Sequence, residues 1–156
     1  MIVGEASTTV AVPPSDVFEF VLDLNRYRHA DRKIGKVGAM TRTGDSGTVS
    51  FSGRINGLPG PAGTYPFTIT ASRLVIGSAI AGPARWFLDF EGTFDCKVTA
   101  EGTVVTHREV FNLKRPWEWL VEPMLRGWLE TDTVDEMVRF NNSWTAAKTV
   151  QPRSQK

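Results

Sequence analysis

A histidine and a glutamate two residues apart, His107 and Glu109, are the strongest candidates for acid–base chemistry in this sequence. They lie in a segment of strand character, where side chains at positions i and i+2 point to the same face. On an apolar face such a pair can act as general acid and base, since burial and mutual charge move both pKa values toward neutrality. A structural interpretation competes with this one: a buried histidine commonly satisfies its own hydrogen bonds, and Glu109 would pair with Arg108 or Arg73 at the sheet edge.

The direction of these two side chains depends on the hairpin turn around residues 99–102. A turn of two or four residues puts both of them on the apolar face of the hairpin. A three-residue turn with a bulge would instead send Thr106 and Arg108 inward. Phe111 and Leu113 favour the first register, because it buries them.

A second polar cluster contains His29 and Asp31, followed by Arg32 and Lys33. These side chains can bind a carboxylate or phenol of a ligand, or form an ordinary solvated loop. Two histidines and one cysteine in the whole chain, without the usual ligand spacing, argue against a zinc site with four ligands. We therefore predict no metal, and no phosphate-binding glycine motif indicates another cofactor.

The elements that must position these candidates follow an α+β order. Residues 2–12 predict a strand, residues 14–24 a helix and residues 25–29 a second short helix or turn. Alternating apolar and polar residues with Gly and Pro turns predict antiparallel strands over residues 34–113, and residues 116–144 predict a long helix. The fold class is a helix-grip: a six- to seven-stranded curved antiparallel sheet wrapped around a long C-terminal helix, with two short helices after the first strand.

The apolar stripe of the long helix has to be buried against the concave face of the sheet, which encloses an apolar pocket. The stripe contains Trp117, Val121, Met124 and Trp128 and continues through Val134 and Val138. Met137, Phe140 and Trp144 fall on another side, so the helix bends, rotates or meets a partner such as a second copy of the chain.

The pocket walls are predicted from the inward positions of these elements. Trp86 and Trp128 offer flat rings that suit aromatic or polycyclic ligands. Asp135 follows Trp128 by seven residues and so returns to the same helix face, as Thr131 does less closely. The predicted ligand-binding residues are Tyr27, His29, Phe51, Tyr65, Trp86, Leu88, Phe90, Met124, Trp128, Thr131 and Asp135.

Residues 10–18 (VAVPPSDVF), residues 22–27 (LDLNRY) and the closing helix resemble the START-like helix-grip (SRPBCC) superfamily, and within it the bacterial polyketide cyclase/dehydrase and lipid-transport group. The resemblance implies a hydrophobic cavity between sheet and helix, in a group that includes aromatase/cyclases and carriers. After Tyr27 that group often has a proline and a tryptophan, whereas residues 28–31 read Arg-His-Ala-Asp here. The cavity mouth is therefore expected to be more polar than usual.

Composition excludes several other classes. Eighteen basic and 17 acidic residues give a net charge of +1, which provides no stripe for nucleic acid. The single Cys96 cannot form an internal disulfide, and neither a signal peptide nor a membrane span is evident, so we expect a cytoplasmic protein without membrane insertion. Residues 1–148 predict one domain, and residues 149–156 a flexible polar tail.

Three functions follow from these expectations, in decreasing order of support. The first is binding or carriage of a small apolar ligand, such as a lipid, polyketide or terpenoid-like molecule. The second is an aromatase/cyclase-type enzyme that uses pocket acid–base residues. The third is a protein–protein interaction module, which includes a possible homodimer.

Overall fold

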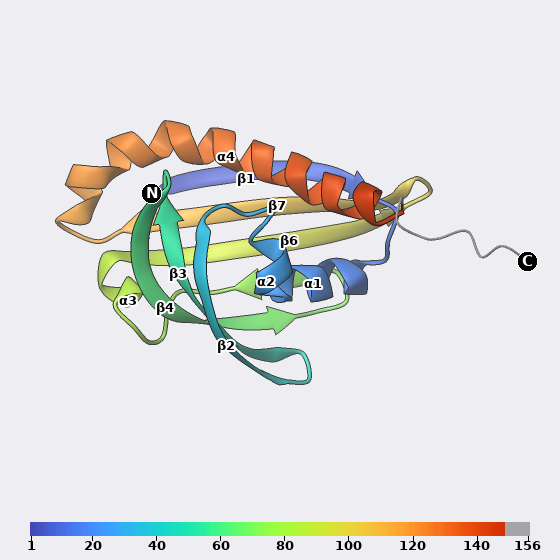
Figure 1. The fold of residues 1–156 in the computed structure, drawn as a ribbon, viewed down its shortest axis with the longest axis horizontal. Coiled ribbons are helices and arrows are strands. Elements are labelled where there is room, and N and C mark those ends of the chain that lie inside the picture. Colours follow the sequence, from blue (N-terminus) through green and yellow to red (C-terminus); the bar gives the residue numbers. More distant parts are fainter. Residues whose placement is uncertain (149–156) are drawn as a thin grey trace, which may run out of the picture.

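A computed structural model describes residues 1–148 as one seven-stranded antiparallel sheet with a long helix across it (Figure 1). The strand order in the sheet is β1-β7-β6-β5-β4-β3-β2. The strands are β1 (Ile2–Val10), β2 (Ile34–Thr43), β3 (Ser46–Ile55), β4 (Leu58–Ile69), β5 (Arg73–Ile76), β6 (Leu88–Thr99) and β7 (Gly102–Leu113). The predicted helix-grip architecture and its seven strands are confirmed.

The helices are α1 (Pro14–Leu22), α2 (Leu24–Tyr27), α3 (Ala84–Phe87) and α4 (Trp117–Lys148). Proline occupies the first position of α1, where its missing N–H costs nothing, and the Asp23 side chain accepts a hydrogen bond from the Arg26 N–H to cap α2. The short α2 turns Tyr27 into the core, as the sequence predicts. In Figure 1, α1 and α2 lie under the C-terminal part of α4.

Two tight turns set the register of the sheet. Asn56 and Gly57 both have positive φ angles, of 48° and 81°, which a two-residue hairpin turn between β3 and β4 requires. Between β6 and β7 the loop contains only Ala100 and Glu101, because Thr99 pairs with Gly102. The predicted even register of this hairpin is therefore confirmed.

The buried face of α4 differs from the stripe predicted from sequence. Its buried positions are Leu125, Leu129, Thr133, Glu136, Met137 and Phe140, whereas Val134 and Val138 are exposed. Met137 and Phe140 therefore belong to the same inward face as Leu129, and no bend or partner is needed to bury them. The helix packs on β1, where Gly4 leaves no room for a Cβ atom beside the Thr133 hydroxyl and Leu129.

Two further differences concern α3 and the C-terminus. The segment around Trp86 reads as a strand in the sequence, but Ala84–Phe87 forms α3 before β6 begins at Leu88. The predicted tail, residues 149–156, lies outside the described residues. Within residues 1–148, no helix has both the length and the apolar character needed to cross a membrane.

Candidate functional site

A cavity lies between the concave face of the sheet and α4, and it holds about 970 Å³ of empty space including its open mouth. Most of its walls are apolar. One end carries Tyr27, Asp31, Lys33, His107 and Glu109, and the further charged lining residue, Arg54, is exposed. The structure thus contains the predicted cavity, and its polar groups are concentrated at one end.

The apolar end is built from aromatic rings of the sheet. Phe51 on β3 stacks on Tyr65 of β4 with ring centroids 4.4 Å apart. Phe90 on β6 packs edge-on against Tyr65 at 6.0 Å and contacts Phe111 of β7 at 5.1 Å. Leu88 and Trp128 also line this region. Of the predicted ligand-binding residues, Tyr27, Phe51, Tyr65, Leu88, Phe90 and Trp128 line the cavity, together with the predicted catalytic pair His107 and Glu109.

Five predicted residues are placed elsewhere. Trp86 on α3 is 65% exposed and stacks under the Arg85 guanidinium instead of lining the cavity. His29 is exposed because α2 turns the adjacent Tyr27 inward. The inward face of α4 is rotated from the predicted stripe, and this leaves Met124, Thr131 and Asp135 exposed.

At the polar end, one buried ammonium group lies among four carboxylates. The Lys33 Nζ lies 3.0 Å from Asp31 Oδ1, 3.2 Å from Glu109 Oε2 and 3.0 Å from Asp132 Oδ2. It also donates a short hydrogen bond to Glu136 Oε2. These groups come from the loop before β2, from β7 and from α4, so the ion cluster joins the sheet to the helix.

The balance of charge in this cluster is negative. Burial alone would lower the pKa of Lys33, but the four surrounding carboxylates outweigh that effect and hold it well above its usual value. Arg139 lies 3.4 Å from Asp132, and it supplies a second cation. With His107 protonated, four carboxylates face three cations, and burial together with Glu136 raises the pKa of Asp31. The cluster therefore favours an additional proton or cation.

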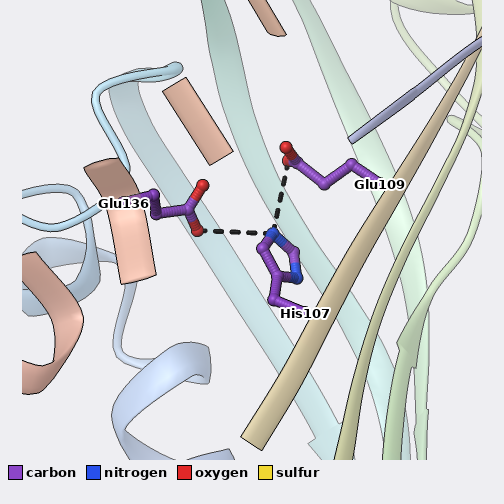
Figure 2. A group of neighbouring side chains, drawn as sticks. All are labelled: His107, Glu109 and Glu136. Atoms are coloured by element: carbon purple, nitrogen blue, oxygen red, sulfur yellow. Dashed lines mark ion pairs between the residues drawn. The ribbon is translucent and has the colours of Figure 1, made fainter. Parts of the chain in front are cut away.

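His107 lies within this cluster and is 2% exposed. Its ring stacks on Phe94 at 4.0 Å, and its Nδ1 lies 3.0 Å from the backbone carbonyl oxygen of Thr93. The other ring nitrogen, Nε2, faces Glu109 Oε1 at 3.6 Å and Glu136 Oε1 at 3.3 Å (Figure 2). Burial alone would lower the pKa of His107, but Glu136 and Glu109 raise it to about 9.

Tyr27 completes the cluster by donating a short hydrogen bond to Glu136 Oε1. Burial and the charge of Glu136 raise the pKa of the Tyr27 phenol well above its usual value, so the group is a hydrogen-bond donor at neutral pH. The arrangement can donate protons or hydrogen bonds, and it can hold a cation. It contains no exposed nucleophile.

Two members of this cluster, Asp132 and Glu136, were not predicted from sequence, and Lys33 was predicted only as a neighbour of the polar cluster of His29 and Asp31. The signal for Glu136 was available, because it lies three residues after Thr133 and four before Phe140 on one helical face. Glu136 is nevertheless a residue type that rarely lies in a core, and its three partners, Tyr27, Lys33 and His107, are distant in sequence.

Comparisons with known proteins agree with this geometry. The family model for polyketide cyclase / dehydrase and lipid transport matches residues 1–142. The chain therefore belongs to the polyketide cyclase/dehydrase and lipid transport family. No curated protein sequence gives a significant match.

Solved structures share the fold at low sequence identity. A protein from Thermus thermophilus is 16% identical, with a TM-score of 0.73 over 93% of this chain and 98% of its own. The Zhui aromatase/cyclase from Streptomyces is 15% identical, with a TM-score of 0.68 over 99% and 98%. A START superfamily protein from Mycobacterium smegmatis is 13% identical, with a TM-score of 0.68 over 93% and 98%. The chain thus shares its fold with these structures.

Proposed function

We propose that this protein binds and carries a small hydrophobic ligand, such as a lipid, polyketide or terpenoid-like molecule, in the cavity between the sheet and α4. The observation that carries the proposal is the continuous aromatic wall of Phe51, Tyr65, Phe90 and Phe111 inside a closed fold. A hollow lined by such a wall gives up packing contacts that larger side chains would supply, and an apolar pocket with a few polar groups is the usual form of a ligand site. Membership of a family described by lipid transport agrees with this role.

The charged end gives the ligand an orientation. Tyr27 and Lys33 line this end but already donate to carboxylates, whereas His107 Nε2 makes no hydrogen bond to a described residue and can meet a polar group of the ligand, with Glu109 beside it as an acceptor. An apolar body with one polar end fits this layout: its apolar part occupies the aromatic region, and its carbonyl or hydroxyl group lies at the charged end.

Two glycines provide a matched test of the location of the ligand. Gly53 lines the cavity on the same strand face as Phe51 and Ile55, and an added Cβ would meet only the Pro61 carbonyl oxygen at 3.9 Å. Gly127 on α4 does not line the cavity, and an added Cβ there meets nothing within 4 Å. The same change, Gly→Leu, therefore fills the cavity in one variant and only the surface in the other.

The measurement is titration with the neutral apolar dye N-phenyl-1-naphthylamine, followed by fluorescence. The unmodified protein is expected to bind one dye per chain, Gly53→Leu to bind it at least about tenfold more weakly, and Gly127→Leu to bind it normally. Equal affinity of all three proteins would contradict a ligand site in this cavity. Native mass spectrometry of the protein purified from its own host would then identify a retained ligand.

A second candidate function is an aromatase/cyclase-type enzyme, and the position of His107 and Glu109 on the cavity wall favours it. A pKa of about 9 makes His107 an imidazolium at neutral pH, so its role would be general acid toward a ligand carbonyl. Glu109 would be the corresponding base. A neighbouring structure is named an aromatase/cyclase, at 15% identity.

The test of this enzyme is incubation with a linear poly-β-ketone thioester and mass spectrometry of the products. Cyclisation with loss of water that disappears in both His107→Gln and Glu109→Gln supports the enzyme. Retention of the unchanged polyketone by all three proteins supports carriage alone.

The third candidate, an interaction module, rested on an exposed patch of Met137, Phe140 and Trp144, but the first two are 2% and 0% exposed and Trp144 is half-buried against the core. The homodimer and the cytoplasmic location remain predictions from sequence.

The free Cys96 is buried, and burial together with Asp95 raises its pKa to about 11, which suits a small core residue that stays reduced.

A further inference from the structure

His107, Glu109 and Glu136 direct one atom each toward a common point at the charged end of the cavity (Figure 2). One ligand atom of each residue lies within 4.8 Å of the other two, and His107 Nε2 lies 3.6 Å from Glu109 Oε1 and 3.3 Å from Glu136 Oε1. All three side chains are buried, with exposures of 2%, 2% and 0%. The two glutamates reach this point from different elements, β7 and α4.

The state of the histidine ring is set by its other nitrogen. A backbone carbonyl only accepts hydrogen bonds, so Nδ1, 3.0 Å from the Thr93 oxygen, carries a hydrogen. In the neutral ring this leaves a lone pair on Nε2, directed at the two carboxylate oxygens. Histidines that bind metals are typically oriented by such a bond from the second ring nitrogen to a carbonyl or carboxylate.

Nε2 is buried and makes no hydrogen bond of normal geometry with any described residue. Its separations from Glu136 Oε1 and Glu109 Oε1, 3.3 and 3.6 Å, exceed the usual 2.7–3.2 Å of an N–H···O bond. Bonds of 2.0–2.2 Å to a tetrahedral zinc ion put neighbouring ligand atoms about 3.3–3.6 Å apart. The spacing of the nitrogen from both oxygens therefore suits a shared metal ion better than a shared hydrogen.

Most contacts of the two carboxylates are made through the oxygens that face away from this point. Lys33 occupies the opposite oxygens, Oε2 of Glu109 and Oε2 of Glu136, and Thr133 contacts Glu109 Oε2 at 3.3 Å. Tyr27 donates to Glu136 Oε1, which keeps a second lone pair. Lys33, Thr133 and Tyr27 thus hold the carboxylates in place from outside the common point.

We propose that His107, Glu109 and Glu136 form a binding site for one zinc ion at the charged end of the cavity. When His107 gives up its proton to act as a ligand, the four carboxylates of the cluster face only two cations, Lys33 and Arg139, and a divalent cation balances the difference. His107 and Glu109 line the cavity, so a fourth position faces the ligand space and is open to water or to a ligand oxygen. A carbonyl or hydroxyl oxygen of a bound ligand would then be held by the metal.

The first experiment uses the full chain without an affinity tag, freed of metal with a chelator and dialysed. Isothermal titration with zinc chloride is expected to give one ion per chain, and cobalt(II) chloride to give the strong visible absorption of a four-coordinate site. Absence of stoichiometric zinc binding in this protein would overturn the proposal, whatever the outcome of the dye titration.

The location of the ion can be determined without substituting any of its proposed ligands, because the chain contains only two histidines. Long-range proton–nitrogen NMR gives one set of imidazole signals for each, and His29→Gln assigns them. Zinc is expected to shift the Nε2 signal of His107 and leave that of His29 unchanged. Zinc binding without a shift of His107, for example at Asp31, Asp132 and Glu136, overturns the proposal.

Paired variants then test the ligand set. His107→Gln and Glu136→Gln are expected to weaken zinc binding at least about tenfold, whereas the exposed neighbours His29→Gln and Asp135→Asn are expected to keep it. Circular dichroism checks that each variant is folded. Unchanged affinity in a folded His107→Gln protein would refute the assignment.

Discussion

The two ends of the cavity use opposite means to stabilise one fold. The apolar end consists of stacked rings such as Phe51 and Tyr65. The hydrophobic effect that stabilises their burial has no preferred direction. The charged end places one ammonium, Lys33, among four carboxylates that are nearly inaccessible to water. Removing charges from water costs several kcal/mol per ion, so this end is stable only while its partners remain complete.

The difference indicates a division of labour. The apolar end offers a ligand hydrophobic contact area, and it tolerates changes in the shape of that ligand. The charged end supplies direction, since its donors and acceptors are fixed by a network that joins β7, α4 and the loop before β2. Substitutions at the two ends, compared with changes on the surface, test this division.

The largest effect is expected for Lys33→Met, which leaves four buried carboxylates without their common cation. Loss of one partner of a buried ion pair costs about 3–5 kcal/mol, and here four partners lose it together. The free energy of unfolding, measured in urea at neutral pH, is expected to fall by at least that amount. Lys36→Met, at an exposed position on β2, is the control and should change stability little.

The same variant has a defined pH dependence. Without Lys33 the buried carboxylates bind protons more tightly in the folded than in the unfolded chain, so stability falls as pH rises. The loss in free energy of unfolding, relative to the unmodified protein, should therefore be smaller at about pH 5 than at about pH 7. A deficit that grows on acidification would contradict the account of the cluster.

Two tyrosines compare the ends directly. Tyr27→Phe removes the hydroxyl that donates to Glu136, and it should cost about 1–3 kcal/mol because a buried carboxylate loses a donor. The Tyr65 hydroxyl has no hydrogen-bond partner among residues 1–145, and burial raises its pKa to about 12. Tyr65→Phe should therefore stay within about 0.5 kcal/mol of the unmodified protein. An equal loss of stability in the two variants, measured by thermal unfolding, would contradict the distinction between the two ends.

The smallest effect is expected for a surface ion pair of the same chemistry. Arg73 Nε lies 2.8 Å from Asp95 Oδ1, but both side chains are about half exposed. Arg73→Met should cost about 0–1 kcal/mol, and this cost should shrink further in high salt. A cost close to that of Lys33→Met would show that burial is not what distinguishes the charged end.

The fold was predictable because its signals are local. Alternation along β3, β6 and β7, the proline at the start of α1 and the two-residue turn at Ala100 and Glu101 each act over a few residues. The short α3 was missed because Trp86, Leu88 and Phe90 alternate like a strand, and only tertiary packing turns Trp86 outward.

The charged cluster was only half predictable for a physical reason. His107 and Glu109 follow from the parity of one hairpin, which sequence specifies. Asp132 and Glu136 depend on the rotation of α4 about its axis, which is set by contacts with β1 and β7. Large apolar residues lie on several faces of α4, so the sequence is compatible with more than one rotation of the helix about its axis. The stripe predicted from sequence is partly exposed in the structure.

Gly4 on β1 shows how a residue can shape a binding space that it does not touch. It is absent from the cavity wall, yet the lack of its side chain lets α4 lie close to the sheet at Thr133 and Leu129. An alanine at this position would act as a spacer that lifts the helix from the strand and separates Glu136 from His107. The capacity of the cavity is thus adjustable from its outer edge, by single methyl groups, with every wall residue left unchanged.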